Sequence, residues 1–123
     1  HWDLAFEKWK KRSLNGEKMA VYTVHERDTE LIKSGHGFTK FLHQSKGEGE
    51  PTIMIRHWGP ETDIPVHSHP FNEMFYVLEG EVFFGDQICG PGSCIFIDKN
   101  TEYGPTQVSK EATVLRYAEG RSK

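Results

Sequence analysis

The sequence has few cysteines, no surplus of basic residues and no long apolar run, and each absence excludes a class of protein. Two cysteines among 123 residues are too few for a scaffold held by disulfides. With 15 Lys and Arg against 18 Asp and Glu, the formal net charge is −3, which predicts no basic surface for nucleic acid. No stretch approaches the roughly 18 consecutive apolar residues of a membrane span. We therefore expect a soluble protein with neither a nucleic-acid partner nor a membrane partner.

The two cysteines, Cys89 and Cys94, flank a Gly-Pro-Gly turn. Their spacing differs from the paired spacing of a zinc knuckle, so it does not indicate a structural zinc site. A disulfide across a short hairpin and two free thiols are both compatible with this pattern. We favour two free thiols in a reducing compartment, and this interpretation places the protein in the cytoplasm.

The length is typical of one domain, and we expect residues 1–123 to share a single core. From Trp2 to Arg12, apolar residues recur every three to four positions, which predicts a short amphipathic helix. From Lys18 onward, short β-branched or aromatic runs alternate with Gly, Pro and Asn, and this pattern indicates an all-β sandwich or barrel. The expected strands are Met19–His25, Phe38–His43, Thr52–Trp58, Met74–Leu78, Val82–Phe84, Cys94–Ile97 and Thr113–Tyr117.

A possible metal site lies between Gly59 and Gly80. His67 and His69 are two residues apart, so both imidazoles face the same side of an extended strand. A turn containing Pro70 and Asn72 follows them, and it allows the carboxylate of Glu73 to return toward the imidazoles. Two histidines and one carboxylate leave coordination positions open, as non-haem iron chemistry requires, and the same ligands suit Mn, Zn, Ni or Cu.

The spacing of His67, His69, Glu73 and Gly80 resembles the first motif of the cupin superfamily. Gly59 departs from that motif, because seven residues separate it from His67 where five are usual. A second cupin motif follows, with Gly85, Pro91 and Gly92 in its hairpin. The resemblance implies a double-stranded β-helix, also called a jelly-roll barrel, whose core motifs occupy residues 59–104.

The resemblance also implies a fourth ligand, a histidine, at a position that holds Tyr103 here. Tyr103 is therefore either a phenolate ligand or a hydrogen-bonding phenol near the metal, and we favour the phenol. Phenolate ligation needs a strongly acidic metal such as ferric iron, because the ordinary pKa of tyrosine is near 10. His57 alternates with Arg56 along a strand, so only one of the two faces the cavity, and His57 is a second candidate for a proton carrier.

The leading functional hypothesis is an iron-dependent dioxygenase that cleaves a small carbonyl or phenolic compound. A redox-neutral isomerase, lyase or decarboxylase is the alternative, with Tyr103 or His57 carrying protons. A non-enzymatic sensor that binds a small molecule is the third hypothesis. In each case we expect one divalent metal ion, iron before Mn, Zn, Ni or Cu, on ligands that contribute little to stability. We also expect a homodimer, from the apolar helix face of Trp2, Phe6 and Trp9 and from the family's habit of pairing barrels.

Overall fold

The computed structural model describes residues 21, 23–47 and 49–120. In this part of the chain the regular elements are strands and one short 3₁₀ helix. In chain order they are η1 (Glu26–Asp28), β1 (Ile32–Ser34), β2 (Gly37–His43), β3 (Thr52–Trp58), β4 (Asp63–Ile64), β5 (Glu73–Phe84), β6 (Gln87–Cys89), β7 (Cys94–Ile97) and β8 (Thr106–Ala118).

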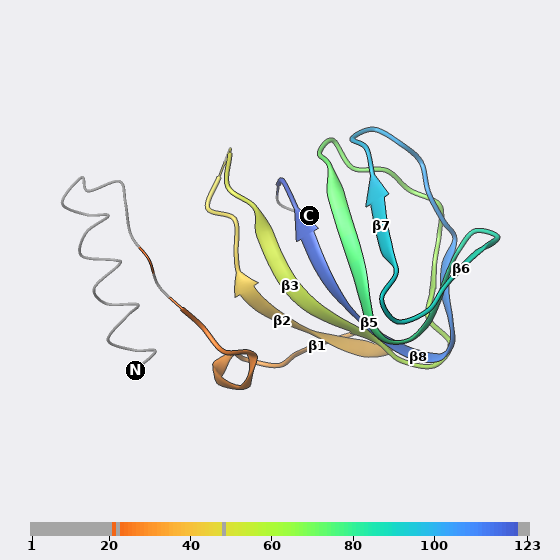
Figure 1. Ribbon diagram of the computed structural model, residues 1–123, viewed down its shortest axis with the longest axis horizontal. Helices are drawn as coiled ribbons and strands as arrows, with labels where there is room; N and C mark the ends of the chain where they lie inside the picture. The colour runs from red at the N-terminus through yellow and green to blue at the C-terminus, as the bar shows by residue number, and fades with distance from the viewer. Residues whose placement is uncertain (1–20, 22, 48, 121–123) are drawn as a thin grey trace.

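The strands form one antiparallel eight-stranded sheet in the order β1-β2-β3-β8-β5-β6. In addition, β4 pairs with β8 and β7 pairs with β5. Two long, bent strands, β5 and β8, pair with each other and carry the other strands on their remaining edges. Figure 1 shows that the sheet curves from β2 round to β7 about a common interior. This is the jelly-roll architecture that the sequence predicted.

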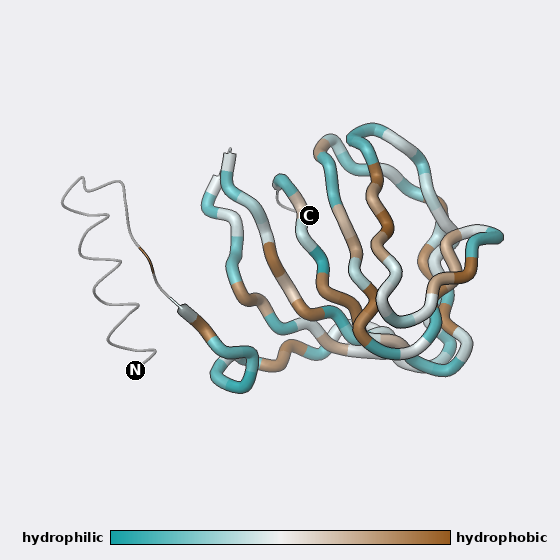
Figure 2. The backbone as a smooth tube through the Cα atoms, viewed as in Figure 1, coloured by the Kyte–Doolittle hydropathy of each residue, from teal (hydrophilic) through white to brown (hydrophobic). Residues whose placement is uncertain are grey.

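The inward face of the sheet follows the two-residue period of a strand. Along β5, Phe75 and Val77 are buried, whereas their neighbours Tyr76 and Leu78 are exposed. In Figure 2, hydrophobic residues lie mainly along the strands and hydrophilic residues lie mainly in the turns. The buried core cluster consists of Trp58, Phe75, Val77, Val82, Phe84, Ile97, Ala112 and Val114.

Three of the predicted strands, Phe38–His43, Thr52–Trp58 and Cys94–Ile97, correspond closely to β2, β3 and β7, and the others differ. The predicted segments Met74–Leu78 and Val82–Phe84 are parts of one continuous β5, which passes between them through register shifts. The last strand begins at Thr106, seven residues before its predicted start. The strand predicted at Met19–His25 is wrong at the described residues 21 and 23–25, which belong to no strand.

The amphipathic helix predicted at Trp2–Arg12 lies outside the described residues. Within them, the only helical segment is the three-residue η1, whose N-cap is the side chain of His25. None of the described residues form a helix long and apolar enough to cross a membrane. Both Cys89 and Cys94 are free thiols, as favoured from the sequence.

Candidate metal and ligand site

His67 is fixed by an isolated antiparallel bridge to Tyr103. The backbone N–H of each residue donates to the carbonyl oxygen of the other, over 3.2 Å and 3.0 Å. The ring centroids of His67 and Tyr103 are 4.6 Å apart, and those of His67 and His69 are 4.9 Å apart. The structure therefore brings together three of the four residues that the sequence predicted as metal ligands.

Glu73, the fourth predicted ligand, is the first residue of β5 and is 1% exposed. Its Oε2 accepts hydrogen bonds from two nitrogens of Arg116, at 2.8 Å from Nε and 2.6 Å from Nη2. Arg116 is itself 6% exposed, so this is a buried ion pair. The pair orients the carboxylate and leaves its second oxygen, Oε1, directed elsewhere.

His67, His69 and Glu73 each carry an atom in this region that could serve as a metal ligand. The Nδ1 of His67 lies 2.8 Å from the carbonyl oxygen of Pro65, which can only accept, so this nitrogen carries the proton and Nε2 keeps a lone pair in the neutral ring. The Oε1 of Glu73 is buried, has no hydrogen-bond partner and lies 3.9 Å from the Nε2 of His69. These donor types, two imidazole nitrogens and one carboxylate oxygen, fit a divalent transition metal.

The spacing of these donors is looser than a complete metal site requires. Among the described residues, no three His, Cys, Asp or Glu side chains are grouped so that they could hold a metal ion as placed. The residues therefore fit a metal by donor type and by the unpartnered carboxylate oxygen, but they do not form a closed coordination sphere.

His57 does not face this region, which corrects its predicted part in catalysis. Its ring stacks on Phe38, with centroids 4.9 Å apart, and its Nδ1 lies 2.8 Å from the hydroxyl of Thr113. Its Nε2 lies 3.1 Å from the exposed carboxylate of Glu111. Because successive strand residues point to opposite faces, Arg56 faces the interior and His57 faces outward.

A cavity of about 350 Å³ lies beside the two histidines. Its volume falls within the range of roughly 300–1,000 Å³ that is usual for small-molecule sites. The wall is lined by Ser34, Thr39, Phe41, Met54, Arg56, Trp58, Ile64, His67, His69, Phe75, Tyr103, Thr106 and Arg116.

Comparison with known proteins identifies the family. The cupin domain family matches residues 54–117, just over half of the chain. The chain belongs to the cupin family. No curated protein sequence matches it.

Solved structures resemble this cupin in fold at low sequence identity. An RmlC-like cupin from Ralstonia eutropha JMP134 has a TM-score of 0.69 at 17% identity, covering 81% of this chain and 70% of that one. KdgF from Halomonas sp. has a TM-score of 0.71 at 12% identity, with coverages of 85% and 97%. HppE in its FeII form has a TM-score of 0.67 at 14% identity, with coverages of 82% and 62%. At these identities the likeness establishes the fold alone.

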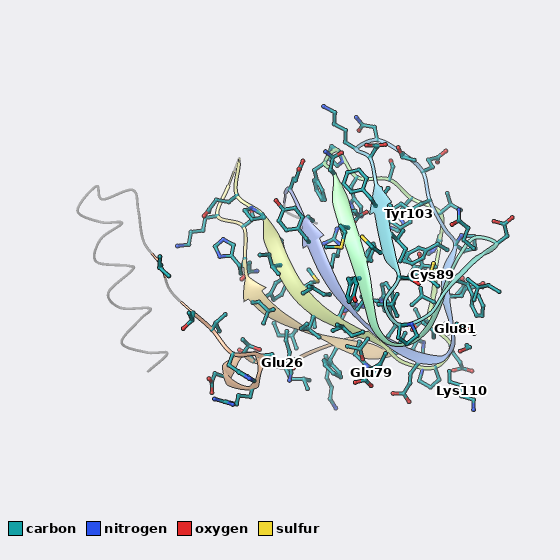
Figure 3. All side chains as sticks on the ribbon, in the orientation of Figure 1. Glu26, Glu79, Glu81, Cys89, Tyr103 and Lys110 are labelled. Atoms are coloured by element: carbon teal, nitrogen blue, oxygen red, sulfur yellow. The ribbon has the colours of Figure 1, made fainter. Side chains whose placement is uncertain are left out.

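Tyr103 stands where small cupins usually carry their histidine ligand, and it is a protonated phenol. Burial raises its pKa above the ordinary value of 10, and the negative charge of nearby Glu73 and hydrogen bonding with its carboxylate raise it further, against the opposing charge of Arg116. Tyr103 is partly buried against the core. Figure 3 shows it on the same side of the molecule as β7. In this environment the side chain can donate a hydrogen bond or a proton to a bound molecule.

His69 is a neutral base at physiological pH. Partial burial lowers its pKa below the ordinary 6.5, and the charges of Arg116 and His67 act in the same direction, against the attraction of Glu73. Its lone pair therefore stays available for a metal at neutral pH. The ring stacks on Phe71 with centroids 5.1 Å apart, which limits its rotation.

Two residues of this cavity, Arg56 and Arg116, were not predicted as functional. The sequence did contain a sign of the role of Arg116, because Arg116 alternates with Val114 along the predicted strand Thr113–Tyr117 and so shares its buried face. An arginine in such a position needs an internal carboxylate, and Glu73 is that carboxylate. The signal for Arg56 was its alternation with His57, which left open which of the two faces inward.

Proposed function

We propose that this cupin is a metal-dependent enzyme that transforms a small molecule in the cavity beside His67 and His69. The observation that carries the proposal is the buried Oε1 of Glu73, which makes no hydrogen bond of standard geometry and lies 3.9 Å from the Nε2 of His69. A buried carboxylate oxygen without a partner is costly, and a bound cation would satisfy it. His67, His69 and Glu73 would hold the ion, and Tyr103 would remain a protonated neighbour.

The chain's own residues prepare the site in two ways. The Pro65 carbonyl fixes the tautomer of His67, and the Arg116 guanidinium fixes the orientation of the Glu73 carboxylate. The apolar side chains of Phe41, Trp58 and Phe75 line the same cavity, where they exclude water from a bound molecule.

The preferred reaction class is oxygenation by non-haem iron. Three protein ligands leave positions for a substrate and for O₂, and bound iron would supply the activation of oxygen. A small carbonyl or phenolic compound would be the substrate. HppE, a fold neighbour, was solved in an FeII form, which is compatible with iron in a barrel of this shape.

A redox-neutral reaction is the second candidate, and Tyr103 favours it. The phenol is kept protonated beside the ligands, so it can serve as a general acid to a substrate oxygen. Lyase, isomerase or decarboxylase chemistry needs such a proton donor and needs no oxygen. Solved structures with a similar fold include those of the polyketide cyclase RemF and of DMSP lyases.

Metal analysis and oxygen dependence test the proposal together. Protein purified without added metal is expected to contain close to one divalent ion per chain, and the His69→Ala variant is expected to lose it. Oxygen uptake with aromatic ketones, diketones and phenols is expected for the oxygenase. Turnover of the same compounds under argon would select the redox-neutral class.

The matched control is His25→Ala, since His25 is an exposed histidine that caps η1, far from the site in sequence. It is expected to keep the metal content of the wild type. A wild-type protein that binds no Fe, Mn, Zn, Ni or Cu, or a His69→Ala variant that keeps a stoichiometric metal, would contradict the proposal.

A further inference from the structure

The cavity wall carries positive charge that no carboxylate of the wall balances. Two arginines and two histidines line it, and no Asp or Glu does. The charge of Arg116 is neutralised by its ion pair with Glu73, which is not part of the wall. Arg56 forms no ion pair with any residue in the described part of the chain, and its Nη1 donates a hydrogen bond to the hydroxyl of Thr39 over 2.6 Å.

Arg56 is unusual because its positive charge is partly buried but not paired with a carboxylate. The side chain is only partly exposed, and burial lowers its pKa below 12.5, as does the positive charge of Arg116. An arginine remains protonated at neutral pH despite such a shift. One of its five N–H donors binds the hydroxyl of Thr39, so most of its N–H donors remain available to a ligand.

Other unpartnered polar groups lie in the same wall. Trp58 is 4% exposed and Thr106 is 1% exposed, and neither the indole Nε1 nor the hydroxyl Oγ1 has a partner. Trp58 lies two residues after Arg56 on β3, so the two side chains share the inward face. Arg56, Trp58 and Thr106 therefore contribute N–H and O–H donors that lack a protein acceptor, which is the pattern expected around an anion.

We infer that the cavity binds a small organic carboxylate, with its carboxylate group on Arg56 and its apolar body against Phe41, Trp58 and Phe75. A planar guanidinium suits a carboxylate because two parallel N–H donors can meet its two oxygens. That this anion is the substrate rests on the proposed function, whereas the anion site itself does not. The inference narrows the substrate class from small carbonyl or phenolic compounds to those that also carry a carboxylate.

Binding to the metal-free full-length chain tests the site without any contribution from a metal. In the presence of a chelator, benzoate and pyruvate are titrated in parallel with their neutral counterparts benzamide and pyruvamide, by calorimetry and ligand-observed NMR. The wild type is expected to bind each anion at least about tenfold more tightly than its amide, in line with the strength of charged hydrogen bonds. Arg56→Gln is expected to lose this preference, and Arg56→Lys to keep part of it.

The matched control is Lys110→Gln, which removes the same charge from an exposed position at the lower edge of the view in Figure 3. It is expected to bind as the wild type does. Equal binding of anion and amide by the wild type, absence of anion binding, or unchanged anion preference in Arg56→Gln would overturn the inference. A thermal unfolding curve, together with retained amide binding, shows that Arg56→Gln is folded.

The anion site and the proposed function fail in different ways. If the carboxylates bind through Arg56 but the protein takes up no metal, the proposed function fails and the anion site stands. If metal binds but compounds that carry a carboxylate turn over equally well in the wild type and Arg56→Gln, the function stands and the carboxylate inference fails.

Discussion

At the scale of single residues, the two carboxylate oxygens of Glu73 have different neighbours. Oε1 lies near His69, and Oε2 accepts hydrogen bonds from Arg116. From the sequence we expected the proposed metal ligands to contribute little to the stability of the fold. For Glu73 this expectation conflicts with the structure, since its removal would leave a guanidinium buried without a partner. The sequence could single out Glu73 but could not identify Arg116 as its partner, because the pairing joins residues 43 positions apart.

Glu73→Ala is therefore expected to lower the free energy of unfolding by about 3–5 kcal/mol, the usual cost of breaking a buried ion pair. His67→Ala and His69→Ala are expected to cost about 1 kcal/mol or less, since both side chains are partly exposed. Denaturant unfolding of the metal-free proteins measures these differences. Glu79→Ala, which removes an exposed carboxylate from the same strand, is the control and should be close to neutral. Equal stability of the Glu73 and Glu79 variants would show that the ion pair adds nothing.

Tyr103→Phe is expected to keep its metal and to lose turnover. The raised pKa of Tyr103 keeps the phenol protonated, so its hydroxyl serves a bound molecule instead of the ion. Metal content, turnover and the visible spectrum of the oxidised protein are the measurements. A phenolate-to-iron charge-transfer band in the wild type, absent from Tyr103→Phe, would instead identify Tyr103 as a ligand, with ferric iron lowering its pKa.

At the scale of elements, the sequence predicted best where β-branched and aromatic residues form a short continuous run. Thr52–Trp58 and Cys94–Ile97 have the predicted bounds because their β-branched and aromatic runs end at Gly or at charged residues. Very short or polar segments were missed, including Gln87–Cys89 and the first half of β8. These strands form because neighbouring strands offer backbone partners, which is information that local composition does not contain.

Gly80 joins the two halves of β5, and its motif position has a structural cause. Its φ of 82° is unfavourable for a side chain, and a Cβ there would meet the Glu111 carbonyl oxygen and lie 2.7 Å from the Cα of Ala112. Gly80→Ala is therefore expected to destabilise the fold by about 2–4 kcal/mol. Gly92→Ala is the matched control, because its φ is 90° but nothing lies within 4 Å of an added Cβ. It should cost only about 1 kcal/mol, from backbone strain alone. Thermal unfolding that ranks the two variants equally would contradict this account.

At the scale of the whole molecule, the barrel has two chemically different faces. The interior combines the apolar core with the histidines, arginines and carboxylate of the site. The outer face of β5, β7 and β8 carries exposed aromatic residues, with Phe96 60% exposed, Tyr76 40% and Tyr117 37%. The register places Phe96 and Tyr117 on opposite sides of Met74, so they share this face.

A homodimer remains a prediction. It was based on Trp2, Phe6 and Trp9, which lie outside the described residues, and the outer aromatic face adds a second reason, since exposed apolar patches commonly mark interfaces. A two-fold dimer would bury the same face of both copies.

Light scattering after size exclusion at micromolar concentration is expected to give twice the 14.1 kDa chain mass. Phe96→Lys is expected to shift the protein toward monomer, because it places a charge in the middle of this face. Ile88→Lys makes the same change at an exposed residue of β6, near the opposite end of β5, and is expected to leave the dimer intact. A monomeric wild type would refute the dimer, and a dimer that survives Phe96→Lys would place its interface elsewhere.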